Sequence, residues 1–108
     1  MPVYHKLVRD HIPAILEKKG LSYQTKILHN SDYKDALHAK LQEEIKEYLE
    51  ADKDHESLEE LADILEVMHA LAKTHGADIA KVEEIRKKKA EDRGKFEDKV
   101  LLVEVGDE

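Results

Sequence analysis

Two pairs of carboxylates, each with its members three positions apart, are the residues of this chain best suited to chemistry. Glu44 and Glu47 form the first pair, and Glu60 and Asp63 form the second. Residues three apart on a helix are neighbours on one face, so each pair can direct both carboxylates at one ion. Oxygen ligands without a nearby His or Cys suit a hard cation such as Mg²⁺ or Mn²⁺. The pairs therefore predict a metal site of the kind that serves phosphate chemistry.

The helix faces that carry these acids are largely apolar. At about 100° per residue, Glu44 falls at the edge of an apolar stripe, and Glu60 falls within another. An unpartnered buried carboxylate costs several kcal/mol, so such acids take up protons or bind a cation. The alternative is chance, because 40% of the residues are charged and most such pairs are solvated surface. The apolar stripes are Leu37, Leu41, Ile45, Tyr48 and Leu49 for the first pair, and Ile64, Val67 and Leu71 for the second.

Four helices are predicted to position these residues. Pro13 suits the opening turn of the first helix, which Asp10 can cap, and glycines mark the ends of the first, third and fourth helices. Asp78 is the predicted cap of the fourth helix, and the tight connection at Gly76 predicts antiparallel packing of the last two. The predicted ranges are 10–20, from residue 30 or 31 to about 51, from about 57 to 76, and 78–94.

Two short segments are expected to be extended. Residues 21–28 are rich in β-compatible types, and residues 99–105 (KVLLVEV) are predicted to form a short strand that pairs with them. The expected fold is a single all-α domain over residues 1–108, a small bundle of about four helices. Because a chain of 108 residues has a thin core, we expect a homodimer or homotetramer to complete it.

The composition narrows the class of protein. The formal net charge of −7 argues against binding of nucleic-acid polymers, but a bound dication would still allow a nucleotide substrate. The absence of cysteine excludes disulfides and thiol chemistry. No signal-like or membrane-spanning apolar run is visible, so no membrane association and a cytoplasmic location are expected.

The acidic pairs resemble a known signature. The run Glu43-Glu44-Ile45-Lys46-Glu47, followed after twelve residues by Glu60-Leu61-Ala62-Asp63, resembles the E-E-x-x-E … E-x-x-D pattern of the MazG-like all-α nucleotide pyrophosphohydrolases. That superfamily includes phosphoribosyl-ATP pyrophosphohydrolase and the dimeric dUTPases. The resemblance implies that Glu44, Glu47, Glu60 and Asp63 hold Mg²⁺, or alternatively Mn²⁺. It implies a water-orienting catalytic role for Glu43, for which plain helix surface is the alternative.

The flanking segments resemble a phosphoribosyl-ATP pyrophosphohydrolase-like subgroup. Residues 4–13 (YHKLVRDHIP) are similar to its Y-x-K-L-V-R-D-K-I-P opening, with His11 in place of Lys. Lys89 followed by residues 93–96 (RGKF) is similar to its K-x-x-x-R-G-G-F, with Lys95 in place of Gly. Both departures lie outside the acidic signature, so they concern loop shape rather than chemistry.

Basic residues are candidates for phosphate binding. Lys89 and Arg93 wind onto the same side as the apolar stripe of the last helix, where basic side chains either snorkel or meet anions. Compensation of the helix dipole and salt bridges are the alternative for these two. Lys6 and Arg9 gain weight from the resemblance, but they would equally tie the N-terminal arm to an acidic neighbour.

The predicted reaction is hydrolysis of a nucleoside triphosphate, or of a related nucleotide, to the monophosphate and pyrophosphate. A house-cleaning role is preferred because the domain carries no fused partner; phosphoribosyl-ATP hydrolysis and a non-catalytic interaction or regulatory module are the alternatives. A di-iron carboxylate site is a further alternative, because Glu66 precedes His69, and Asp35 precedes His38, at its helical spacing.

Overall fold

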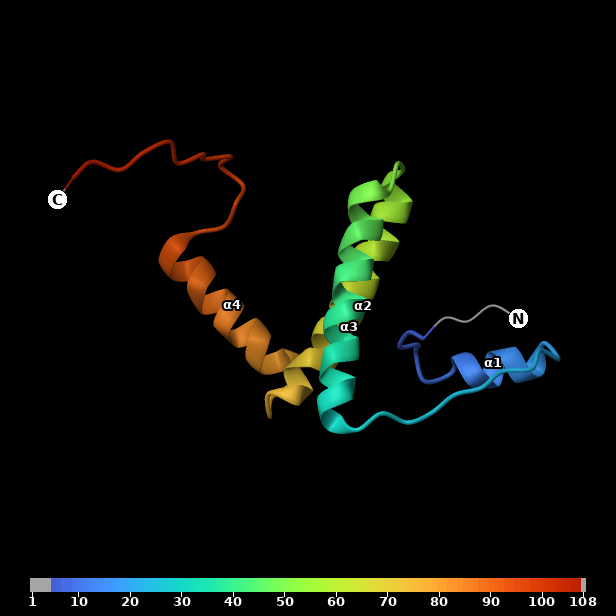
Figure 1. Cartoon of the computed structure of the whole chain (residues 1–108). Coiled ribbons are helices and arrows are strands. Elements are labelled where there is room, and N and C mark those ends of the chain that lie inside the picture. The colour runs from blue at the N-terminus through green and yellow to red at the C-terminus, as the bar shows by residue number, and fades with distance from the viewer. Residues whose placement is uncertain (1–4, 108) are drawn as a thin grey trace.

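A computed structural model describes residues 5–107 of the chain, and it is all-α. The described residues contain no strand, so the strand predicted at 99–105 is wrong. Those residues run without a partner for their backbone, away from residues 21–28 (Figure 1). The four helices are α1 (Ile12–Lys18), α2 (Asn30–Glu50), α3 (Asp54–Thr74) and α4 (Ile79–Arg93).

Helices α2 and α3 form an antiparallel pair at the centre of the molecule (Figure 1). A short link with extended backbone at Ala51 and Lys53 reverses the chain between them. Helix α3 begins three residues before the predicted Ser57. Its first turn contains Asp54 and Glu56, whose negative charges are favourable beside the positive end of the helix dipole.

The buried apolar residues lie on these two helices. Leu37 of α2 and Val67 and Ala72 of α3 are 3%, 7% and 6% exposed. The apolar stripe predicted on α2 is buried at Leu37, but its C-terminal part is exposed. The exposed residues of that stripe are Ile45, Tyr48 and Leu49.

Helix α4 does not pack along α3, so the predicted antiparallel pairing of these helices is wrong. Gly76, at a φ of 72°, ends α3, and Asp78 caps α4 by accepting a hydrogen bond from the backbone N–H of Lys81 at 3.1 Å. From this turn α4 diverges, and none of its residues is buried (Figure 1). The physical reason is that α4 is mostly charged, so a long packed interface with α3 would bury little apolar surface.

The shape of the chain is extended. Its radius of gyration is 18.6 Å, with extents of 63 × 36 × 25 Å. A compact domain of this length would have a radius of gyration of about 13 Å. Four apolar side chains that share one face of α3 are exposed: Leu58, Leu61, Leu65 and Met68. Among the described residues, no helix is long and apolar enough to cross a membrane.

Candidate metal centre

Three of the four predicted metal ligands converge across the interface between α2 and α3. Glu44 and Glu47 come from successive turns of α2, and Glu60 comes from α3. One carboxylate oxygen of each lies within 4.8 Å of the others. We call these residues the acidic trio. Within residues 5–107, it is the one group of three or more potential ligands brought this close.

The trio contains buried oxygens that lack hydrogen bonds. Glu44 is 5% exposed, and its Oε1 lies 3.3 Å from Nζ of Lys40. Its Oε2, and Oε2 of Glu60, are buried without a partner among the described residues. A buried acceptor without a donor destabilises the fold by about 1–3 kcal/mol. A cation between the carboxylates would satisfy both oxygens.

Burial and negative charge also change the acidity of Glu60. Desolvation, followed by the neighbouring Glu44 and Glu47, raises the pKa of Glu60 to about 7. At neutral pH its carboxyl group therefore exchanges between the protonated and ionised forms. A dication would compete with this proton, because it favours the ionised carboxylate.

The donor set fits Mg²⁺ or Mn²⁺. All three side chains offer oxygen, and three protein ligands leave coordination positions for water and for substrate phosphates. Glu44 and Glu47 lie on α2 and Glu60 lies on α3, so a bound ion would be held by both helices.

Asp63, the fourth predicted ligand, lies next to the trio along α3 but has a different partner. Its Oδ1 accepts a hydrogen bond of 2.7 Å from Nη2 of Arg9. The same guanidinium lies 3.9 Å from Oε1 of Glu66 through Nη1. Arg9 thus holds the N-terminal segment against α3, which is the arm-tying role that the sequence left open.

Glu43 is also paired with a residue of the N-terminal segment. Nζ of Lys6 donates to its Oε1 at 3.0 Å, and Nζ of Lys40 donates to its Oε2 at 3.5 Å. The hydrogen bond from Lys6, together with Lys40, holds the pKa of the Glu43 carboxyl below its ordinary value. The same contact raises the pKa of Lys6. An ionised carboxylate held by two lysines is a weak base, so Glu43 is poorly suited to take a proton from water. Its contacts favour a different role for Glu43, which is to position the Lys6 side chain.

A comparison with protein families identifies the family of the chain. Residues 3–90 match the model of the family described as phosphoribosyl-ATP pyrophosphohydrolase. The chain belongs to this family. It is therefore a nucleotide pyrophosphohydrolase, and the predicted membership of the MazG-like superfamily is confirmed. Searches of curated proteins and of solved structures gave no match.

The family match covers most of the residues predicted for the site. It contains the trio, Asp63, Lys6, Arg9 and Lys89, and it ends before Arg93. The family implies a nucleotide substrate, whose phosphates are anionic. Basic side chains are needed close to the acidic trio to bind it.

The basic residues of α4 are not close to the trio in this chain. Lys89 and Arg93 are exposed near the far end of α4, which leads away from α2 and α3 (Figure 1). Arg86, on the same helix, donates from Nε to Oε2 of Glu83 at 2.7 Å. Arg93 occupies the last turn, where a positive charge favours the helix dipole.

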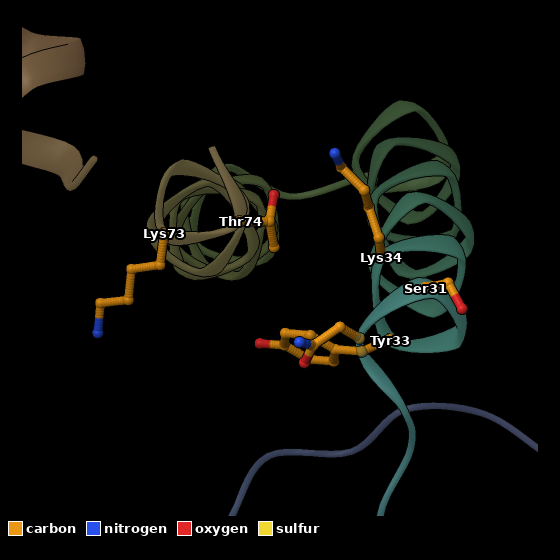
Figure 2. A pocket seen from close by; sticks show the side chains of 6 residues that line it. Ser31, Tyr33, Lys34, Lys73 and Thr74 are labelled. Carbon is orange, nitrogen blue, oxygen red and sulfur yellow. The ribbon is translucent and has the colours of Figure 1, made fainter. Parts of the chain in front are cut away.

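A separate pocket of about 470 Å³ lies at the opposite end of the helix pair. Figure 2 shows Tyr33 between the ends of α2 and α3, with the side chain of Lys73 pointing away from α2. Tyr33 lies eleven residues before Glu44 on α2, or about 16 Å along the axis. None of the trio lines the pocket, which therefore does not form part of the acidic site.

The pairs that suggested a di-iron site are not assembled. Asp35, His38 and Glu66 are exposed, and none of them, nor His69, joins a metal-ligand group among the described residues. The iron site needs carboxylates and histidines from four helices facing one centre. The structure therefore favours the acidic trio.

Proposed function

We propose that the chain hydrolyses phosphoribosyl-ATP to phosphoribosyl-AMP and pyrophosphate with Mg²⁺ held by the acidic trio. The family match supports this substrate more than the broad range of nucleoside triphosphates that the sequence first favoured. The house-cleaning role receives no support of its own from the described residues.

The observation that carries the proposal is the pair of buried, unpartnered oxygens on Glu44 and Glu60. Both residues belong to the acidic trio, in which one carboxylate oxygen of each residue, Glu47 included, lies within 4.8 Å of the others. When bound, a magnesium ion would neutralise phosphate charge and lower the pKa of a bound water. The trio would fix the position of this positive charge, because the two helices hold the three carboxylates together before substrate binds.

Arg9 is proposed to exchange its ion pair with Asp63 for an ion pair with a substrate phosphate. Its guanidinium suits a bidentate grip on phosphate, and its present partner Asp63 is half-exposed. Transfer of Arg9 to a substrate phosphate would free Asp63 to complete the ligand set of the trio. Lys6 lies on the same N-terminal segment as Arg9 and would move toward the substrate phosphates with it. Glu43 would position Lys6 through their hydrogen bond, and a water-orienting role for Glu43 would act through this contact.

Lys89 and Arg93 are proposed to bind phosphates at the site of a second copy. Within one chain, α4 carries them away from the trio (Figure 1). The radius of gyration of 18.6 Å and the exposed apolar side of α3 support an assembly of copies. A homodimer is the smallest assembly that would supply these cations.

A substrate panel tests the function. Purified protein is incubated with Mg²⁺ and phosphoribosyl-ATP, common NTPs or dNTPs, and the release of pyrophosphate and orthophosphate is measured separately. The proposal expects pyrophosphate, with the highest kcat/KM for phosphoribosyl-ATP. Preference for a dNTP would restore the house-cleaning hypothesis, and no hydrolysis of any nucleotide would favour the non-catalytic alternative.

A further inference from the structure

Two extended segments of the chain have no partners for their backbone groups. Among the described residues, no backbone–backbone hydrogen bond involves residues 22–28 or residues 100–107, whereas residues 96–98 form a bend and a turn after α4. We call residues 100–107 the C-terminal tail. Unpaired N–H and C=O groups in an extended segment are a template for pairing with another strand.

The side chains of both segments follow strand patterns. In the first, Leu21, Tyr23, Thr25 and Ile27 alternate with the polar Ser22, Gln24 and Lys26, as in a strand with one buried face. Ile27 is nevertheless 96% exposed. The alternation predicts that a partner covers this face.

The tail is apolar on both faces. Five of its residues, all exposed, would alternate to opposite sides of a strand, and a run of this kind is typical of a strand with neighbours on both faces. Their exposed fractions are 73% or more. These residues are Val100, Leu101, Leu102, Val103 and Val105.

One chain does not bring the two segments together. Residues 21–28 follow α1 on one side of the α2–α3 pair, and the tail leaves the end of α4 on the other side (Figure 1). Helix α4, with 15 residues, is a rigid spacer of about 22 Å between the α3 turn and the tail. The pairing expected from the sequence is therefore absent within the chain, although both strand patterns are present.

We propose that the C-terminal tail of one copy pairs as a β-strand with residues 21–28 of a second copy. Each copy offers one tail and one acceptor segment of similar length, so a two-fold dimer closes with two identical strand pairs. A foreign partner would satisfy only one of the two segments. This strand exchange involves no residue of the acidic trio, and it does not depend on the substrate.

Intermolecular disulfide formation tests the exchange, because the chain has no cysteine of its own. Thr25→Cys is combined in turn with cysteine at each position from 100 to 105, which covers the registers that place Thr25 opposite the apolar run. Unlabelled and ¹⁵N-labelled copies of each double variant are mixed after unfolding, refolded and oxidised. The cross-linked peptides are then identified by mass spectrometry.

The strand exchange predicts that at least one pair cross-links efficiently and that about half of its product joins a labelled to an unlabelled chain. Thr25→Cys with Lys87→Cys, on the exposed side of α4, is the matched control and is expected to cross-link at least about tenfold less. Products that join only chains with the same label would show an intrachain contact and overturn the proposal. Absence of cross-linking in all six pairs would overturn it as well.

A second measurement does not depend on register. The double variant Leu101→Glu/Val103→Glu changes two residues that lie outside the four helices. Its helical circular dichroism should therefore equal that of wild type. Light scattering after size exclusion should show the dimer dissociating at a protein concentration at least about tenfold higher than for wild type. Asp107→Lys in the same tail is the control. A wild-type monomer, or a double variant that dimerises as tightly as wild type, would contradict the exchange.

Discussion

Glu44 on α2 and Glu60 on α3 each bury one carboxylate oxygen that no donor of the described chain reaches, and both belong to the trio whose ligand atoms lie within 4.8 Å. Two like charges at this separation repel one another in a site with little water. The protein relieves this repulsion either by keeping a proton on Glu60 or by binding a cation. Each of these states leads to a measurable consequence.

Replacement of a trio carboxylate should abolish most of the activity. Glu60→Gln keeps the size of the side chain but removes the charge, so we expect a loss of at least about 100-fold in pyrophosphate release at saturating Mg²⁺. Glu59→Gln is the matched control, because Glu59 is its exposed neighbour on α3. Equal rates for Glu59→Gln and Glu60→Gln would rule out the trio as the reaction centre.

The metal-free protein should lose stability as the pH rises through about 7. The folded-state pKa of Glu60 lies above its ordinary value of 4.5, so its contribution is fully present below pH 4.5 and is lost as the pH passes the raised pKa. Tm measured in EDTA should fall as the pH rises from about 4.5 to about 7, and it should level off above the raised pKa. Mg²⁺ should reverse most of this fall, because it binds the ionised carboxylate.

The Glu60→Gln variant distinguishes the titration of Glu60 from that of the other ionisable groups, because glutamine does not titrate. The variant should have a higher Tm than wild type in EDTA at pH 8, with a smaller difference at pH 5. It should also gain little from Mg²⁺. A pH profile of Tm that is parallel for variant and wild type would show that Glu60 does not titrate in this range.

Arg9 should matter more for catalysis than for stability. Its pair with Asp63 is exposed, so Arg9→Ala should lower the free energy of unfolding by less than about 1 kcal/mol. If Arg9 transfers to a substrate phosphate, kcat/KM should fall by about 10- to 100-fold, with Arg9→Lys in between. Arg86→Ala, which breaks the pair with Glu83 on α4, is the control. An unchanged kcat/KM in Arg9→Ala would restrict Arg9 to tying the N-terminal segment.

Mixed oligomers test whether α4 serves a neighbouring site. Glu60→Gln and Arg93→Ala are each expected to be weakly active alone. When they are refolded together in equal amounts, half of the dimers should be mixed, and each mixed dimer should contain one intact site, which restores about a quarter of wild-type activity. No gain on mixing would mean that Arg93 acts within its own chain or not at all.

The four helices and much of the acidic site can be predicted from the sequence, because helices are determined largely by local patterns. The positions of α2 and α3, and the convergence of Glu44, Glu47 and Glu60, follow from helical spacing on an antiparallel pair. The partner of Asp63 was not predictable in the same way. Arg9 lies 54 residues away in the chain, and helical periodicity carries no information about a contact between segments so far apart.

The course of α4 and of the tail could not be read from periodicity either. The turn at Gly76 predicts an antiparallel pair, but a charged helix such as α4 gains too little by burial to be held against α3. The strand pattern of residues 99–105 was visible, whereas its partner was not. The incorrect predictions, for the α3–α4 pair and for the strand at 99–105, both concern packing between elements. Such packing depends on which apolar surfaces meet, and a second copy can cover some of them.

Equilibrium binding of Mn²⁺ tests the central claim most directly. Free Mn²⁺ is measured by electron paramagnetic resonance while wild type, Glu60→Gln and Glu59→Gln are titrated at pH 7.5 without nucleotide. The acidic trio predicts saturable binding to wild type and to Glu59→Gln, with a Kd at least about tenfold weaker for Glu60→Gln. Equal binding to all three proteins, or none to any of them, would contradict a metal centre between α2 and α3.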